Sequence, residues 1–288
     1  MYMIFLFGRK IKWYCIALLF LATFCIWFLI YQGSSKTLSV SFLDVGQGDS
    51  IFIETPSKNQ ILIDGGPPNK KVLRELGKKM PFYDRHIDVV IGTHPDQDHI
   101  GGFIDVLNRF KIGIFLEPGL PNDTSVYKEI VNLISEKKIK NIIAKRGMRL
   151  LLDEEAYMDI IFPDRGVSGF DTNDASIIAR LVYGDHEFLL TGDSPQKIEK
   201  YLAYVDGKNL ESDVLKAGHH GSKTSTSGEL LSVVNPKYVV ISSGKENSYG
   251  HPHEEVLNRL KDFKVGILRT DTLGTITFET DGKTMKIK

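Results

Sequence analysis

Cysteine is scarce in this 288-residue chain, and both of its cysteines, Cys15 and Cys25, fall within the first 31 residues. The remaining sequence therefore has no disulfide, no thiolate ligand for a metal and no cysteine nucleophile. An excess of charge is also missing, since 36 basic residues match 36 acidic ones. This balance gives no general attraction to nucleic acid or anionic lipid, so a polyanion would have to be held by a local basic patch or by bound metal.

One long uncharged run lies near the N-terminus. Residues 13–31 contain no charged side chain, begin and end with aromatic residues, and follow Arg9, Lys10 and Lys12. As a helix, the run would be about 28 Å long, which is close to the hydrocarbon thickness of a bilayer. A cleavable signal peptide is the alternative, but its apolar region is usually shorter and ends in a small-residue cleavage site, which is not evident in residues 30–36.

We therefore predict three parts. Residues 1–32 form a cytoplasmic basic flank and a transmembrane anchor, residues 33–37 form a linker, and residues 38–288 form one globular domain. Because the basic flank precedes the apolar run, the positive-inside rule places the N-terminus in the cytoplasm. The expected protein is single-pass, located in the cell membrane, with its C-terminal domain extracytoplasmic.

Short apolar runs alternate with amphipathic stretches throughout the globular part. Strands are predicted at residues 37–42, 50–54, 60–63, 87–92, 112–116, 141–144, 157–162, 176–183, 186–190, 212–216, 238–242, 266–269 and 275–279. Helices are predicted at residues 69–79, 99–110, 125–138, 196–205, 227–234 and 253–263. Each half begins with strands and continues as strand–helix alternation, so we expect an α/β fold with two sheets face to face and helices outside.

The first chemical motif follows the predicted strand 87–92. His94, Asp96, Asp98 and His99 can all bind a divalent ion, and they occur within six residues. One ion cannot readily use all four side chains, so a pair of ions is the simpler interpretation. Capping of the next helix, which Asp98 could provide, would leave the other three residues unexplained.

Three further motifs follow predicted strands or turns. Asp193 ends an apolar strand beside a glycine and could bridge two metals, although an aspartate in a turn is more often structural. His219 and His220 are adjacent and flanked by glycines, so one could ligate while the other bonds to substrate or to the residues around the metals. His251 and His253 add two imidazoles in a later turn, so six of the eight histidines lie in three short motifs.

Six ordered motifs carry a family resemblance. They are FLDVGQGDS at 42–50, IDGG at 63–66, HPDQDHIGG at 94–102, LTGD at 190–193, GHHGS at 218–222 and YGHP at 249–252. Together they resemble the metallo-β-lactamase superfamily, in particular the soluble hydrolase domain of ComEC-type competence proteins, over residues 38–287. The resemblance implies an αββα sandwich, the metallo-β-lactamase fold, with a dinuclear metal site at one edge of the two sheets. The multi-helix channel of a full competence protein is missing from the sequence.

The resemblance also implies ligands. His94 and Asp96 would bind the first ion, Asp98 and His99 the second, Asp193 would bridge them, and His219 would complete the second site. The common pattern has histidine in place of Asp96 and another on a loop where this chain reads DTNDAS, so Asn173, Asp174 or water is expected to substitute. The expected cofactors are two divalent metal ions. Zinc is the preferred identity, and Mn²⁺ is the alternative because the first site is rich in oxygen ligands.

A hydroxide held between two ions would attack phosphorus or a carbonyl carbon. Catalytic roles are expected for Asp98, which could orient the hydroxide, and for His220 and His251. Ser222 and Lys223 are candidates for binding an anionic substrate. Asp49 and Asp64 either hydrogen-bond the backbone of their own Gly-rich turns or hydrogen-bond the metal ligands and so orient them.

The favoured function is a membrane-anchored phosphodiesterase or nuclease acting on DNA or another phosphodiester polymer. The alternatives are a C–N or C–O hydrolase of the β-lactamase or lactonase type, and an inactive metal-binding adaptor. Asp96 and the missing loop histidine argue against a dedicated β-lactamase. No stable protein partner is inferred.

Overall fold

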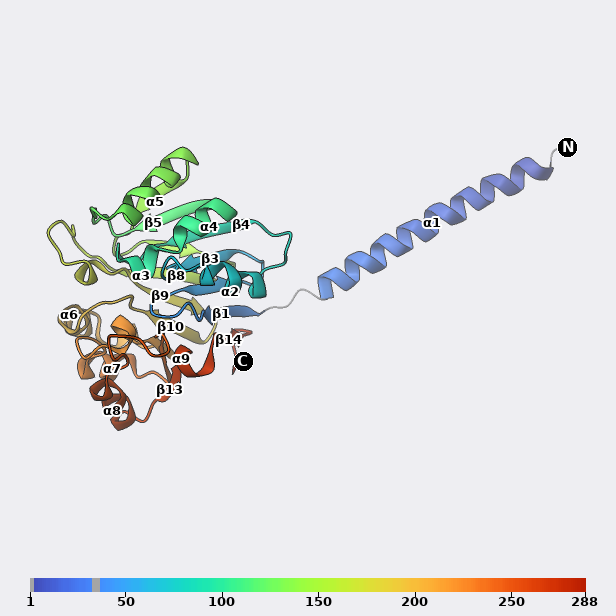
Figure 1. The fold of residues 1–288 in the computed structure, drawn as a ribbon. Coiled ribbons are helices and arrows are strands. Elements are labelled where there is room, and N and C mark those ends of the chain that lie inside the picture. The colour runs from blue at the N-terminus through green and yellow to red at the C-terminus, as the bar shows by residue number, and fades with distance from the viewer. Residues whose placement is uncertain (1–2, 33–36) are drawn as a thin grey trace. The chain divides into compact units, whose positions relative to one another are not determined.

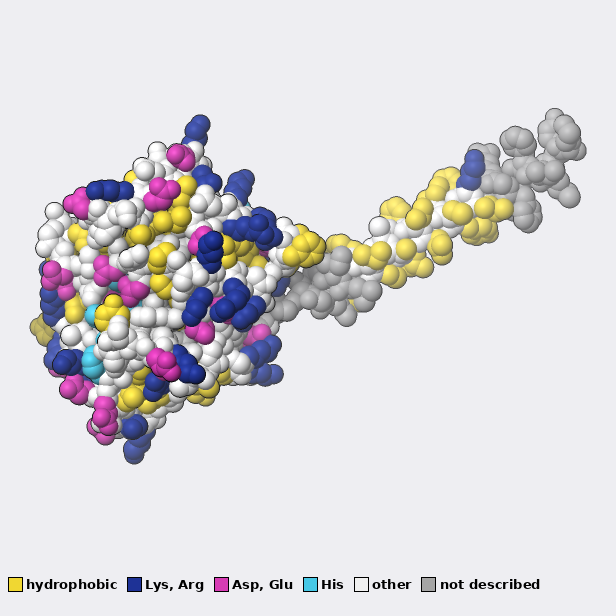
Figure 2. Space-filling view, in the orientation of Figure 1, with side chains coloured by type: hydrophobic (Ala, Val, Ile, Leu, Met, Phe, Trp, Pro, Cys, Tyr) yellow, Lys and Arg dark blue, Asp and Glu magenta, His cyan; other side chains and the backbone are white. Residues whose placement is uncertain are grey.

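The structure is a computed structural model that describes residues 3–32 and 37–288, with the side chains of residues 11–28 in the first range. The chain forms two compact units, Met1–Lys36 and Thr37–Lys288. The first contains helix α1 (Met3–Gln32), whose described side chains are exposed and mostly apolar (Figure 2). Its segment Ile11–Phe28 is long and apolar enough to cross a membrane.

The second unit is built on two β-sheets (Figure 1). The first sheet has the order β15-β14-β1-β2-β3-β4-β5-β6, with strands β1 (Leu38–Phe42), β2 (Ile51–Glu54), β3 (Gln60–Ile63), β4 (His86–Ile91), β5 (Lys111–Glu117), β6 (Lys140–Ile143), β14 (Ile276–Thr280) and β15 (Met285–Ile287). The second has the order β13-β12-β11-β10-β9-β8-β7, with strands β7 (Arg149–Leu151), β8 (Ala156–Phe162), β9 (Ile178–Tyr183), β10 (His186–Leu190), β11 (Val214–Lys216), β12 (Tyr238–Ile241) and β13 (Gly266–Arg269).

The sheets pack face to face, and helices cover their outer faces. Alternate strand residues such as Phe42, Phe188 and Phe278 fill the core between the sheets. The first sheet is covered by α2 (Lys71–Lys79), α4 (Phe103–Arg109) and α5 (Ser125–Glu136), and the second by α6 (Gln196–Asp206), α7 (Gly228–Val234) and α8 (Glu254–Asp262). Short helices are α3 (Gln97–Ile100), α9 (Thr270–Leu273) and the 3₁₀ turns η1 (Asn173–Ala175), η2 (Gly207–Leu210) and η3 (Gly218–Gly221). The predicted αββα sandwich is confirmed.

One predicted helix is wrong in detail. Residues 99–110 do not form one continuous helix but belong to two short helices, α3 and α4. The helix is interrupted because backbone groups between α3 and α4 hydrogen-bond to the neighbouring loop at residues 65–66. The carbonyl of His99 accepts the N–H of Gly65, and the N–H of Gly102 donates to the carbonyl of Gly66. A Cβ at Gly102 would lie 2.0 Å from the Gly65 oxygen, so the approach requires glycine. The short strands β7 and β15, at the sheet edges, were not predicted from the sequence.

Strand direction brings the sequence motifs to one edge. Strands β3, β4, β5 and β6 are parallel, as are β10, β11, β12 and β13. Parallel strands end on the same side of a sheet, so the loops after them meet there. The loops following β3, β4, β10 and β11 carry the motifs at 63–66, 94–102, 190–193 and 218–222.

A buried carboxyl group connects α6 to α7. Glu199 is fully buried, and its two carboxylate oxygens accept the backbone N–H groups of Thr226 and Ser227, each at 2.7 Å. Ser227 is the N-cap of α7, and its side chain accepts the N–H of Leu230. Burial raises the pKa of Glu199 from 4.5 to about 7, although the two N–H groups and the charge of Arg259 act in the opposite direction.

The Glu199 carboxyl should therefore make folding depend on pH. Its pKa is raised in the folded chain, so the stabilisation that it gives is present below pH 4.5 and is lost as the pH rises through about 7. Between pH 5 and 8, the free energy of unfolding of the wild type should fall by about 2–3 kcal/mol relative to Glu199→Gln. Urea unfolding of both proteins at several pH values measures this. The exposed residue Glu136 provides the control, since Glu136→Gln should show no such trend. A constant difference between wild type and Glu199→Gln would contradict the shifted pKa.

Candidate metal centre

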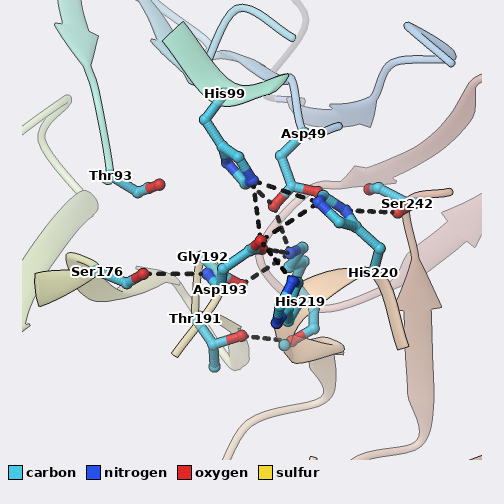
Figure 3. A network of polar contacts seen from close by, with 12 residues as sticks. Asp49, Thr93, His99, Ser176, Thr191, Gly192, Asp193, His219, His220 and Ser242 are labelled. Atoms are coloured by element: carbon cyan, nitrogen blue, oxygen red, sulfur yellow. Dashed lines mark hydrogen bonds and ion pairs between the residues drawn. The ribbon is translucent and has the colours of Figure 1, made fainter. Parts of the chain in front are cut away.

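Asp193 lies at the centre of a cluster of imidazoles (Figure 3). Its Oδ2 atom is 3.2 Å from Nε2 of His99, 3.3 Å from that of His220, 3.8 Å from that of His219 and 3.9 Å from that of His94. Burial by itself would raise the pKa of this carboxyl group. The nearby His220 and His99 instead hold the pKa of Asp193 well below its usual value.

Asp64, at the end of β3, orients His99. Its Oδ2 atom is 2.7 Å from Nδ1 of His99, and the carboxylate also accepts the backbone N–H and the hydroxyl group of Thr93. A carboxylate on one ring nitrogen fixes the ring and leaves the other nitrogen free to ligate. Burial lowers the pKa of His99, but Asp193 and Asp64 together raise it well above the ordinary value.

His94 presents a nitrogen without a hydrogen-bond partner among the described residues. The ring is 1% exposed, and its Nδ1 lies 3.0 Å from the Thr93 hydroxyl group. Its Nε2 lies 3.5 Å from Oδ2 of Asp96, which accepts a hydrogen bond from the hydroxyl group of Thr172. Buried polar atoms are normally paired, so this nitrogen fits a metal ligand.

The adjacent histidines of η3 differ in depth. Both have positive φ angles, 46° for His219 and 53° for His220. The His220 side chain is 1% exposed, its Nδ1 lies 2.9 Å from the Ser242 carbonyl oxygen, and its Nε2 lies 3.2 Å from Oδ2 of Asp98. The His219 side chain is 29% exposed, and its Nδ1 lies 3.3 Å from the Thr224 hydroxyl group. Both rings approach Asp193, and the ring of His220 is the more deeply buried of the two.

The residues predicted to replace the missing loop histidine lie in η1. The side-chain amide of Asn173 is 3.4 Å from Nδ1 of His219, at the border of the cluster. Asp174 forms an ion pair with Lys197 of α6, so the structure does not bring its carboxylate into the cluster.

The other predicted substrate residues lie farther out. Ser222 bonds to the Thr224 hydroxyl group at 2.9 Å, and the backbone N–H of Lys223 donates to Nδ1 of His253. The ring of His251 has its centroid 6.2 Å from that of His220. Burial, together with the charges of the neighbouring histidines, lowers the pKa of His251 to about 4, so this ring is neutral at pH 7.

Lys216 is a member of the cluster that the sequence did not predict. It is the last residue of β11, is 0% exposed, and pairs through Nζ with the carboxylate of Asp49. The same nitrogen lies 3.5 Å from Oδ1 of Asp193 and donates to the carbonyl of Gly192 at 2.8 Å. Burial lowers the pKa of the Lys216 ammonium, but Asp49 and Asp193 raise it above its usual value. The available signal was a lysine at the end of an apolar strand, directly before the Gly-His-His turn.

Negative charge is in excess in this cluster. The cluster holds the carboxylates of Asp49, Asp64, Asp96, Asp98 and Asp193, of which Asp49 and Asp193 lie next to the Lys216 ammonium. Burial lowers the pKa of His99 and of His220, but the neighbouring carboxylates raise both well above the ordinary value, so the negative charge is balanced by cations, either protons on these imidazoles or metal ions. Ligand atoms of Asp49, His99, Asp193 and His220 lie within 4.8 Å of one another. Donors and charge both fit divalent metal, and mixed imidazole and carboxylate donors suit zinc, manganese or iron.

Fold and cluster together define a metal-dependent hydrolase fold of the αββα type. Residues 43–245 match the model of the metallo-β-lactamase superfamily, and this chain belongs to that superfamily. The chain is 33% identical over 266 residues to ComE operon protein 3 of Bacillus subtilis, which covers 86% of this chain and 34% of that protein. It is 32% identical over 240 residues to competence protein ComA of Neisseria gonorrhoeae, with coverage of 83% and 32%. The predicted resemblance is confirmed, and the chain spans about a third of the length of these relatives.

Solved structures share the fold at low identity. CmlA, a diiron β-hydroxylase from Streptomyces venezuelae, is 14% identical, with a TM-score of 0.56 and coverage of 84% of this chain and 54% of that one. Igni18, a metallo hydrolase from the archaeon Ignicoccus hospitalis, is 17% identical, with a TM-score of 0.54 and coverage of 85% and 99%. These likenesses establish the architecture alone.

The central position of Asp193 predicts a large effect on metal binding. Asp193→Asn keeps the shape of the side chain and removes its charge. Affinity for Mn²⁺ or Zn²⁺ should fall by roughly 100-fold or more, since even residues that only support metal ligands contribute about 10- to 100-fold. Competition with a fluorescent chelator measures the affinity. Asp123→Asn, in an exposed loop, is the matched control and should bind like the wild type.

Lys216→Met should destabilise the metal-free protein. The substitution keeps a long side chain but leaves the buried Asp49 carboxylate without its cation, at an expected cost of about 3–5 kcal/mol in the free energy of unfolding. Adding Asp49→Asn should recover much of that loss, which a double-mutant cycle detects. Lys200→Met is the control, because the side chains of Lys200 and its partner Glu229 are both exposed, and it should change stability by less than about 1 kcal/mol. Equal effects at positions 216 and 200 would contradict the pairing.

Proposed function

We propose that this chain is a membrane-anchored, dinuclear metal-dependent phosphodiesterase or nuclease. The observation that carries the proposal is the convergence of ligand atoms on one carboxylate oxygen, Oδ2 of Asp193. The Nε2 atoms of His99, His220 and His94 lie 3.2, 3.3 and 3.9 Å from it, Asp96 lies beside His94, and Asp98 lies beside His220. A shared carboxylate between two donor sets is the arrangement that a pair of metals requires.

We assign His220, instead of His219, to the second ion. Its Nε2 is close to both Asp98 and Asp193, and its Nδ1 is fixed by the Ser242 carbonyl. His219 is more exposed, which suits contact with substrate. This exchanges the roles that the family resemblance implied for the two histidines. Oxygen-rich donors around His94 favour Mn²⁺ as much as Zn²⁺.

Two divalent ions in these positions would supply a water of lowered pKa and neutralise charge that develops on phosphate oxygens. The protein contributes fixed geometry, because Asp64 holds the ring of His99 and Lys216 holds one oxygen of Asp193. His219, at the exposed side of the cluster, is placed to bind a substrate oxygen or to donate a proton to a leaving group. Asp98, 37% exposed, is placed to orient water.

Support for a phosphodiester substrate comes from the relatives. Three relatives at 30–33% identity, named ComE operon protein 3, competence protein ComA and recombination protein 2, each align with more than four-fifths of this chain. The names of the last two refer to competence and recombination, so we propose DNA or another phosphodiester polymer as substrate. We further propose that α1 anchors the chain, with its basic N-terminal flank in the cytoplasm and the hydrolase unit outside.

The activity is tested with the full chain in detergent. We expect about two equivalents of metal per chain by elemental analysis, cleavage of bis-p-nitrophenyl phosphate and linear DNA with added Mn²⁺ or Zn²⁺, and loss of at least about 100-fold of this activity in Asp98→Ala. Asp123→Ala, in an exposed loop, should retain activity.

Two results would contradict the proposal in different ways. Bound metal without phosphodiester cleavage, but with turnover of a lactone or a chromogenic β-lactam, would replace the phosphodiesterase with a C–O or C–N hydrolase. Cleavage that survives Asp98→Ala would disprove the assignment of the site.

A further inference from the structure

A groove of about 480 Å³ opens next to the metal centre. Its walls are the glycine-rich loop after β1, the start of α2, the loop after β12, and α9, and its lining includes Gln47, Lys71 and Lys245. Figure 2 shows Lys and Arg side chains over the region where α2 and α9 lie in Figure 1, with acidic side chains among them. None of the contacts described for the metal cluster uses this groove.

Gln47 connects the groove to the metal centre. Its side-chain amide nitrogen lies 3.4 Å from Nδ1 of His251, and its carbonyl oxygen accepts the N–H of Gly244. The ring centroid of His251 is 5.5 Å from that of His219 and 6.2 Å from that of His220. A chain lying in the groove would therefore pass directly from these residues to the imidazoles of the centre.

The groove carries two lysines that form no ion pair among the described residues. In the described part of the chain, Lys71 and Lys245 have no ion-pair partner, and Lys71 Nζ lies over Gly46, 3.1 Å from where a Cβ of that residue would be. Of the two acidic residues of the groove, Asp271 pairs with Arg269 at 2.6 Å, whereas Asp44 accepts the N–H of Gly46 and keeps its charge. The two lysines exceed this one unpaired carboxylate, so the lining keeps a net positive charge.

An aromatic ring stands exposed beside the groove. Tyr249 is 65% exposed, and its ring is stacked on His251 with centroids 5.7 Å apart and planes at 20°. Stacking on His251 fixes the ring and leaves the side chain largely open to solvent. Exposed aromatics combined with unpaired lysines are the elements with which proteins hold unpaired nucleic-acid strands, because bases stack on the ring and phosphates bind the ammonium groups.

We propose that this groove binds an unpaired polynucleotide strand and feeds it to the metal centre, with Lys71 and Lys245 contacting phosphates and Tyr249 stacking on a base. The inference rests on the proposed phosphodiesterase function. A duplex keeps its bases stacked within the helix and cannot place one on Tyr249, so the groove prefers single strands.

Fluorescence anisotropy tests the groove with the full chain, EDTA-treated so that no cleavage occurs, and a labelled 12-mer of thymidylate. Tyr249→Leu should weaken binding about 5- to 150-fold, and Tyr249→Phe should restore it. The double variant Lys71→Ala with Lys245→Ala should flatten the slope of log K against log salt by about 1.4, which corresponds to two phosphate contacts. Tyr204→Leu and Lys137→Ala, at exposed positions on other helices, should bind like the wild type.

Cleavage separates failure of the groove from failure of the proposed function. With metal added, the ratio of kcat/KM for the strand to kcat/KM for bis-p-nitrophenyl phosphate should fall at least fivefold in Tyr249→Leu. Unaltered strand binding in Tyr249→Leu and in the lysine double variant, or a matching duplex bound as tightly as the strand, overturns the groove proposal. A wild type that binds the strand through these residues but cleaves no phosphodiester overturns the proposed function and leaves the groove.

Discussion

Negative charge gathered at one edge of two sheets is the constraint on which this structure depends. Five carboxylates and four imidazoles converge there, and among the described residues Lys216 is the only lysine or arginine that contributes its charge to the cluster. Carboxylates brought this close repel one another unless cations lie between them. The folded edge therefore needs cations among these carboxylates, and the Lys216 ammonium supplies one of them.

Close backbone contacts make this convergence geometrically feasible. A Cβ at Gly48 would lie 2.1 Å from the Asp98 carbonyl oxygen, and one at Gly102 would lie 2.0 Å from that of Gly65. The glycine-rich loops after β1 and β3 thus press against the backbone of the first metal motif. This contact places Asp49 and Asp64 behind the ligands, and it also interrupts the helix that the apolar pattern predicted across residues 99–110.

The sequence predicted the sandwich and the strands that carry the motifs because alternation and strand-end loops are local properties. It did not predict which of His219 and His220 points inward. Both residues have positive φ angles, so the alternation of side-chain direction that holds along a strand does not apply to them. Lys216 was missed because a lysine in a strand is ordinarily exposed, and its burial follows only from the pairing of β11 with β10 and β12. Asp174 was a candidate metal ligand because it is a carboxylate in the expected loop. Its ion pair with Lys197 could not be predicted, because it depends on the position of α6 in the fold.

The residues around Asp193 and those of the proposed groove come from different parts of the chain. Every carboxylate and imidazole around Asp193 lies within residues 43–245, the segment that matches the superfamily model. His251 and Tyr249 lie beyond it, on the loop that closes the groove against Gln47. A metal centre that serves many hydrolases cannot by itself choose a substrate. In the proposed groove, His251 connects the two parts, since its ring is stacked on Tyr249 and borders the two histidines of η3.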